Sequence, residues 1–299
     1  MSHGALLLDK PLGISSNRAL QEAKKLLQAK KAGHAGTLDP LASGLLVLLF
    51  GEATKLAGPL LDDDKEYLAE LKLGEKTSTG DAEGEVLERK DFRGAESDIG
   101  PVLAAFLGEI EQVPPMHSAL KRAGVPLYAL ARKGESVERA ARKVRIGEIE
   151  SLGFSAPRLR LRVRCSKGTY VRTLAEDIGT ALGTCAHLAS LRRTACGRFR
   201  VEDAVTLEAL AAMPAGQRAQ RLLGLDELLR SLPRAELDAG QAARFRNGQT
   251  LKAFPGEGLH AVYGAGEVLG LGQAQAGVLR PLRLLATASQ AADNHRKTL

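Results

Sequence analysis

The start of the chain shows first a strand-like and then a helix-like arrangement of apolar and polar residues. An apolar run over residues 4–9 is typical of a short buried strand, and the turn sequence KPLG follows it. Ser15 or Ser16 can then cap a helix that we expect to continue to about Lys31. Residues 33–44, GHAGTLDPLASG, are rich in glycine, proline and small side chains. They predict a loop that leads into a further apolar strand.

Strict alternation predicts strands in the middle of the chain. Residues 158–165, RLRLRVRC, place arginines on one face and apolar side chains on the other. Residues 67–73 and 142–154 also predict strands, whereas residues 98–107 have a helical pattern. After the arginine-rich strand, a turn leads into a helix that we expect to end near Gly183.

The pattern changes again near Pro233. Helices are predicted over residues 207–229, and short strand-like pieces separated by glycine follow the proline. These pieces cover residues 259–262, 268–271 and 278–284. We therefore expect a small all-β module after a larger first domain, and a frayed polar end after it.

Composition narrows the class of protein. The chain has 299 residues, of which 44% are hydrophobic and 26% charged, which predicts a soluble globular protein of about two domains. The longest apolar run, residues 41–50, is too short to cross a membrane, and the first residues lack a signal-peptide pattern. A cytoplasmic protein is expected. The three cysteines form no CxxC pair, and no local metal or dinucleotide-binding motif occurs.

Positive charge is concentrated in two segments. The formal net charge is +7, yet residues 116–145 alone carry eight Lys or Arg and two acids, and residues 158–200 carry ten and two. Such clusters are typical of a surface that follows phosphates, although solvated basic faces would produce the same count. The aromatic content of 4% and the absence of tryptophan disfavour a single-strand binder built from stacked aromatic side chains.

The loop over residues 33–44 contains the first candidate chemistry. Asp39 precedes a proline, which disfavours helical geometry, and a carboxylate on such a loop can be a nucleophile, a base or simply a turn former. His34 lies in the same loop and is more often a structural residue. Arg172 begins a helix, where a cation is unfavourable against the helix dipole, so a nearby negative group is expected, with Asp39 as a candidate.

Several ordered motifs resemble one family, the TruB-type tRNA pseudouridine synthases. The resemblance covers roughly residues 4–285. It rests on KPLGISS, on GHAGTLDPLASGLL and on four further blocks at residues 65–86, 113–134, 165–179 and 191–199. It implies an α+β fold with a mixed, largely antiparallel sheet, flanking helices and a central cleft.

The resemblance also implies the domain organisation. Residues 1–233 would form the catalytic domain, with an RNA-gripping insertion at about 113–145. Residues 234–286 would form a small β-barrel-like PUA domain that binds RNA, and residues 287–299 a disordered tail.

Roles for individual residues follow from matching positions. Asp39 would be the catalytic aspartate, paired with Arg172, and Tyr67 would be a catalytic residue that stacks on the target base and can help to remove the proton from C5. Tyr170 and Leu191 would line the uracil pocket, and packing in the core is the alternative for Tyr67 and Tyr170.

Two further groups of residues would serve the substrate. His34 would fill the space vacated by the flipped base, and Asp81 would belong to the polar network that orients Arg172 and His34. The RNA-binding positions are Lys10, Lys121, Arg122, Arg132 and Lys133. The arginine-rich strand is expected to add phosphate contacts.

The implied reaction is the isomerisation of uridine 55 in the T-loop of tRNA. It breaks the N1–C1′ bond and forms C5–C1′, so it needs no cofactor, metal or nucleotide energy. Arg172 beside Asp39 would lower the pKa of the carboxyl. Attack on C1′, attack on C6 and proton abstraction from the sugar all stay open. A monomer acting without guide RNA or protein partner is expected. A guide-dependent synthase and an RNA chaperone without catalysis are the alternatives.

Overall fold

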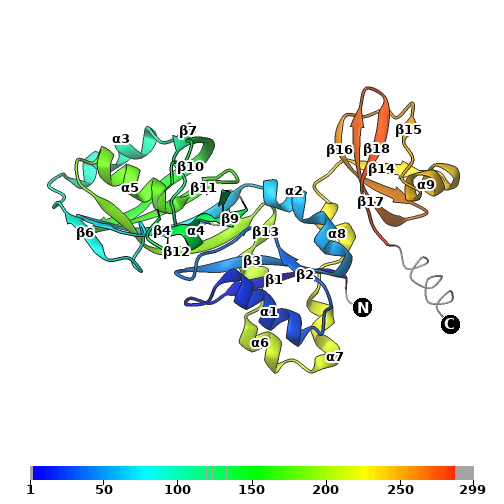
Figure 1. Cartoon of the computed structure of the whole chain (residues 1–299), viewed down its shortest axis with the longest axis horizontal. Coiled ribbons are helices and arrows are strands. Elements are labelled where there is room, and N and C mark those ends of the chain that lie inside the picture. The colour runs from blue at the N-terminus through cyan, green and yellow to red at the C-terminus, as the bar shows by residue number, and fades with distance from the viewer. Residues whose placement is uncertain (1–2, 119, 123, 132, 136, 287–299) are drawn as a thin grey trace.

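The molecule is a mixed α+β structure, as the sequence predicts, and its described residues form a nine-stranded sheet, a five-stranded sheet and two small two-stranded ones (Figure 1). The computed structural model describes residues 3–286 except residues 119, 123, 132 and 136. The expected tail at 287–299 and the expected RNA contact of Arg132 therefore lie outside the described residues. Within the described part, no helix is long and apolar enough to cross a membrane.

A large sheet forms the centre of the first domain. Its strands follow the order β1-β3-β12-β4-β11-β10-β7, with β2 paired to β3 and β13 paired to β12. All neighbouring strands are antiparallel except β3 and β12, which run parallel. The strands are β1 (Gly4–Lys10), β2 (Ala32–His34), β3 (Ala42–Phe50), β4 (Lys65–Leu73), β7 (Gly108–Gln112), β10 (Arg142–Ser155), β11 (Arg158–Cys165), β12 (Ala186–Cys196) and β13 (Phe199–Arg200).

Strand β3 lacks alternation because both of its faces are buried. Leu46 and Leu48 pack with helix α1 (Ser16–Leu26) on one side, and Leu45 and Val47 belong to a second apolar cluster on the other. The loop predicted over 33–44 is shorter than expected, because β2 occupies its first residues and β3 its last.

Capping side chains and residues with positive φ angles set the ends of these helices more closely than the apolar pattern does. Ser15 caps α1 by accepting a hydrogen bond from the Arg18 amide. The expected extension to Lys31 is wrong, because Gln28 adopts a φ of 51° and turns the chain towards β2. Helix α5 (Val171–Ala181) ends as predicted, with Gly183 at a φ of +73°.

The arginine-rich strand alternates as predicted. Its apolar side chains are buried under α5, whereas the arginines face outward. Three of these arginines pair with acids of neighbouring elements: Arg158 with Glu70, Arg162 with Glu150, and Arg164 with Glu148 and Asp64. The outward face is therefore much less positive than the sequence of β11 suggests.

Short elements complete the first domain. The predicted helix over 98–107 covers only α3 (Ile99–Ala104), and the helical region 207–229 is divided at Pro214 and Gly224, which precede new helices. The remaining elements are η1 (Gly51–Leu56), α2 (Ala57–Asp62), β5 (Glu75–Thr77), β6 (Val86–Arg89), η2 (Glu96–Asp98), β8 (Lys121–Arg122), β9 (Val125–Pro126), α4 (Leu127–Ala131), η3 (Val201–Asp203), α6 (Leu207–Ala212), α7 (Ala215–Arg218), η4 (Ala219–Arg221) and α8 (Leu225–Leu229).

The C-terminal part forms its own sheet, in the order β14-β16-β17-β18-β15, at one end of the molecule (Figure 1). The all-β expectation is wrong, because a capping box at Asp238 starts helix α9 (Ala239–Arg246), which packs on this sheet. Tyr263 donates a hydrogen bond to Asp226 at 2.6 Å and joins this part to the first domain. The strands are β14 (Arg234–Leu237), β15 (Leu251–Lys252), β16 (Gly258–Gly264), β17 (Glu267–Gln275) and β18 (Val278–Leu284).

Candidate active site

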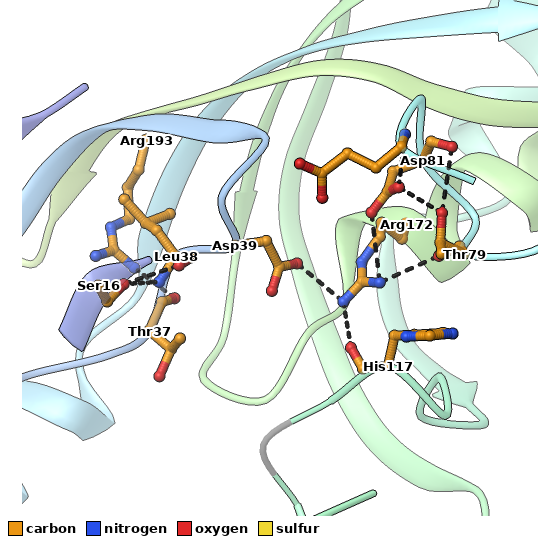
Figure 2. Close-up of polar contacts among 10 residues, drawn as sticks. Ser16, Thr37, Leu38, Asp39, Thr79, Asp81, His117, Arg172 and Arg193 are labelled. Carbon is orange, nitrogen blue, oxygen red and sulfur yellow. Dashed lines mark hydrogen bonds and ion pairs between the residues drawn. The ribbon is translucent and has the colours of Figure 1, made fainter. Parts of the chain in front are cut away.

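Asp39 and Arg172 form an ion pair between the candidate catalytic loop, residues 35–41, and the first turn of α5 (Figure 2). The Arg172 Nη2 atom lies 2.9 Å from Asp39 Oδ2, which confirms the expected contact. The Arg172 side chain is only 6% exposed, whereas that of Asp39 is 41% exposed. The guanidinium is thus part of the protein interior, and the carboxylate remains accessible to a substrate.

Four acceptors hold the guanidinium of Arg172 in place. Besides Asp39, its nitrogens donate to the Thr79 carbonyl at 3.1 Å and to the His117 carbonyl at 2.6 Å. Nη1 also lies 3.5 Å from the buried Asp81 carboxylate, which itself accepts from the Glu83 amide. Asp81 therefore orients Arg172 as expected, and the orientation of Arg172 fixes the position of Asp39.

The electrostatics of Asp39 differ from the prediction. Burial by the surrounding atoms raises the pKa of Asp39 above 3.8. Arg172 lowers that pKa, but the nearby charge of Asp81 raises it again. Desolvation therefore outweighs the ion pair, and Arg172 limits the increase instead of producing a net decrease.

Neighbouring strands bring two more predicted residues to this loop. Leu191 on β12 pairs with Ala42 at the start of β3, three residues after Asp39. Tyr67 on β4 pairs with Arg193 on β12, and both Tyr67 and Leu191 pack against the same two apolar clusters. Burial raises the pKa of Tyr67 to about 12, so the phenol is protonated at neutral pH. In that state Tyr67 offers a stacking surface and a hydrogen-bond donor.

Tyr170 lies at the N-terminal cap position of α5, two residues before Arg172. Its amide donates to the Gln112 side chain at 3.0 Å, which holds the start of the helix against β7. Burial raises the pKa of Tyr170, and the charge of Asp39 acts in the same direction. Tyr170 thus precedes by two residues the arginine that pairs with Asp39.

Other expected contacts are absent at the described residues. Lys10 is 0% exposed, and its ammonium group donates to the carbonyls of Pro11 and Ile14 at 2.9 and 2.8 Å. It stabilises its own turn, and its positive charge also lowers the pKa of Asp39. The His34 Nδ1 atom is buried without a hydrogen bond, so the polar network of Asp81 does not reach His34 through that atom.

The outward face of β11 lies on the other side of the sheet from Tyr67. Tyr67 pairs in register with Val163, so these two side chains lie on one face of the sheet and Arg162 and Arg164 on the other. The expected phosphate contacts from this strand are therefore separated from Tyr67 by the sheet itself. Lys121 and Arg122 form β8 in the insertion, and Lys133 is exposed beyond α4.

Sequence reasoning missed two supports of the catalytic loop. The Ser16 hydroxyl donates to the Leu38 carbonyl at 2.8 Å and accepts from the Leu38 amide at 2.7 Å (Figure 2). Arg193 donates to carbonyls on the other side of the loop. Two features of the sequence could have indicated these supports. One is the serine that follows the helix cap, and the other is the arginine in β12 whose neighbours in the sheet are buried.

Strand β12 approaches the backbone of Gly44 so closely that a side chain at this position would clash with it. Its φ is +98°, and an added Cβ would lie 2.3 Å from the Arg193 carbonyl oxygen. Gly44→Ala is expected to lower the free energy of unfolding by at least about 1–3 kcal/mol, measured by denaturant titration. Gly58→Ala, in open space on α2, is the matched control and should be neutral or stabilising. Equal stability of both variants would contradict this steric argument.

The chain matches models of known protein families along most of its length. A model of the TruB family pseudouridylate synthase N-terminal domain matches residues 24–171. Models of the tRNA pseudouridylate synthase B and TruB C-terminal domains match residues 172–235 and 233–285. The chain belongs to the TruB family. Asp39 and Tyr67 lie within the first match, and Arg172 is the first residue of the second.

Relatives of this TruB-family chain are similar over nearly their full length. A tRNA pseudouridine synthase B from Ralstonia nicotianae is 55% identical and covers 95% of this chain and 94% of its own. One from Aromatoleum aromaticum is 54% identical, with coverage of 96% and 94%. Among solved structures, a chain of a Cbf5-Nop10-Gar1 complex is 26% identical with a TM-score of 0.75, covering 97% of this chain and 87% of its own.

The described residues contain no cluster of His, Cys, Asp or Glu side chains that could hold a metal ion. The chemical groups of the site are a partly exposed carboxylate, a buried guanidinium and two phenols. Such a set can start nucleophilic or acid–base chemistry at one carboxylate and hold a planar base between apolar and aromatic side chains.

Proposed function

We propose that this chain isomerises uridine to pseudouridine at position 55 in the T-loop of tRNA. The observation that carries the proposal is the accessible Asp39 carboxylate, held at 2.9 Å by the buried guanidinium of Arg172 beside Tyr67 and Leu191. Its relatives at 54–55% identity are named tRNA pseudouridine synthase B. The enzyme acts in the cytoplasm, where its tRNA substrate is found.

The chemistry requires one bond to be exchanged for another. The N1–C1′ bond breaks, the uracil turns, C5 bonds to C1′, and the proton on C5 is finally lost. Three first steps are chemically available to an ionised Asp39: attack on C1′, attack on C6, or removal of a proton from the sugar. In each of them Arg172 keeps the carboxylate aligned, and Tyr67 with Leu191 holds the detached base while it turns.

Access to the base requires flipping. A loop uridine in folded tRNA is stacked, and extrusion costs a few kcal/mol. Stacking on Tyr67 and Tyr170 would offset about 1–3 kcal/mol for the base. His34, whose buried Nδ1 atom has no hydrogen bond, would fill the space that the base leaves.

We propose two domains, each built around one of the two larger sheets. Residues 1–233 form the catalytic domain with the RNA-gripping insertion at 113–145, and residues 234–286 form a PUA-like RNA-binding domain. Support comes from the separate apolar core of the second sheet and from β14, which begins at Arg234. We propose that the chain acts as a monomer without guide RNA or protein partner.

The test of the function uses the purified chain and a bare T-arm stem-loop. Pseudouridine formation at the expected uridine, with no added RNA, protein or cofactor, is the expected result. Activity only after addition of a guide RNA and partner proteins would support the guide-dependent alternative. An RNA-folding assay with the Asp39→Asn variant separately tests a chaperone role.

The insertion is expected to bind phosphates. Reversing Lys121, Arg122 and Lys133 to glutamate should weaken tRNA binding, and the slope of log affinity against log salt should fall by about 0.9 for each lost phosphate contact. Binding titrations at several salt concentrations measure both quantities. Arg158→Glu with Arg162→Glu, on the far face of the sheet, is the control. Equal effects in both sets, or none in the insertion, would contradict the assignment.

A further inference from the structure

Arg193 has a buried charge without an acidic partner. Its side chain is 1% exposed, and its guanidinium donates to three backbone carbonyls and also interacts with the hydroxyl of Tyr67. The carbonyl oxygens are those of Leu45 at 2.6 Å, Gly36 at 3.2 Å and Thr37 at 3.5 Å. In the described part of the chain, no carboxylate forms an ion pair with it. Burying a charge in this way is costly, so carbonyl contacts must compensate for lost water.

The acceptors of Arg193 lie immediately before the catalytic carboxylate. Gly36 and Thr37 precede Asp39 by three and two residues, and Leu45 lies beyond it on β3. One guanidinium therefore connects both ends of the catalytic loop to β12. Planar guanidinium donors lie in a rigid arrangement, so they restrain the direction of each carbonyl as well as its position.

The loop is held from the opposite side as well. The Ser16 hydroxyl binds both the amide and the carbonyl of Leu38, the residue before Asp39 (Figure 2). The amide of Gly13 donates to the Pro40 carbonyl at 2.9 Å. The backbone on both sides of Asp39 is thus tied down, and its side chain projects towards Arg172.

Other charged groups near Arg193 do not neutralise it. Lys10 and Lys65 are buried cations whose ammonium groups also donate to backbone carbonyls. The positive charge of Arg193 acts on both lysines and on the hydroxyl of Tyr67. A buried ion pair would explain Arg193 as ordinary stabilisation, but its surroundings contain cations and loop carbonyls instead.

We propose that Arg193 is a positioning residue for the isomerisation: it holds the carbonyls of Gly36 and Thr37 and thereby sets the position of Asp39 relative to the flipped uridine. This inference rests on the proposed function. It predicts that Arg193 controls the rate of the chemical step and not the affinity for tRNA.

The experiment uses the full chain with Arg193→Gln and Arg193→Lys. Arg193→Gln should lower the single-turnover rate at saturating enzyme by about 100-fold, the scale expected for a misplaced catalytic group, with tRNA affinity unchanged within about twofold. Arg193→Lys keeps the charge and one or two donors, so an intermediate rate is expected. The control is Arg192→Gln, whose partly exposed guanidinium pairs with Asp9 at 2.7 Å on the outer side of β12, with an expected rate near that of the wild type.

Hydrogen exchange gives a readout that does not depend on catalysis. In Arg193→Gln, amides of residues 35–41 should exchange faster than in the wild type, while those of β1 and the C-terminal half of β3 should not. If the wild type is inactive on tRNA but this local change occurs, the proposed function fails and the restraint of the loop stands.

Several outcomes would overturn the positioning role. A wild-type rate in folded Arg193→Gln would do so, as would a loss of activity fully explained by weaker tRNA binding. Faster exchange throughout β3 and β12, or failure of both variants to fold, would make Arg193 a general determinant of stability and would equally overturn it.

Discussion

Replacement of Asp39 by asparagine is expected to lower the rate of pseudouridine formation by about 10⁴-fold or more, the scale on which one essential catalytic group is lost. The substitution keeps the size of the side chain and one oxygen that can accept the hydrogen bond from Arg172. It removes the negative charge that every available first step requires. Binding of tRNA should change little, because phosphate contacts outside the site dominate affinity.

Release of tritium from C5-labelled uridine in a T-arm stem-loop measures this prediction. Wild type should release tritium without an added cofactor, and Asp39→Asn should release none above background. Release by both proteins would keep the enzyme and reject Asp39 as its essential group. Release by neither would favour the guide-dependent or binding-only alternatives.

Arg172→Met should reduce both stability and activity. The substitution removes the guanidinium from the Asp81 carboxylate and from the carbonyls of Thr79 and His117, and breaking a buried pair costs about 3–5 kcal/mol. It also removes the strongest influence that lowers the pKa of Asp39. A higher pKa means that the carboxylate is protonated at a higher pH. The acidic limb of the rate profile should therefore move upward, and activity should partly recover as pH rises.

The pH at which the acidic limb of the rate profile falls distinguishes a change in the pKa of Asp39 from a loss of folded protein. Asp81→Asn removes a charge that raises the pKa of Asp39, so its acidic limb should move to lower pH. Both substitutions disturb the contact between Arg172 and Asp81, but they are expected to shift the acidic limb in opposite directions. Rates at saturating substrate across pH, compared with thermal unfolding at each pH, test this. Limbs that coincide with that of the wild type would contradict the assignment.

Regular elements were well predicted where the pattern was local. Alternation over 158–165 gives β11 with unchanged limits, and Gly183 ends α5 as expected. Prediction failed where a turn depends on the following strand, as at Gln28, where α1 gives way to β2. It also missed helix α9, because the helix is short and lies between strand-like pieces.

The candidate site was predicted in part. The unfavourable position of Arg172 at a helix start indicated a negative partner, and Asp39 is that partner. The Lys10 ammonium is buried among carbonyls of its own turn, and the arginines of β11 lie on the face of the sheet opposite Tyr67. Charge along the chain does not reveal which face of a sheet a side chain occupies relative to a distant loop.

The sequence by itself determined the longer strands, the end of α5, the family and the identity of the charged residues at the site, since periodicity, capping and motif order are properties of neighbouring residues. The tertiary structure decided which of those charges meet. The parallel pairing of β3 with β12 brings Arg193 beneath the loop of Asp39, although 154 positions separate the two in the printed numbering. It also decided the pKa of Asp39, because desolvation depends on every atom packed around the carboxylate and not on its sequence neighbours.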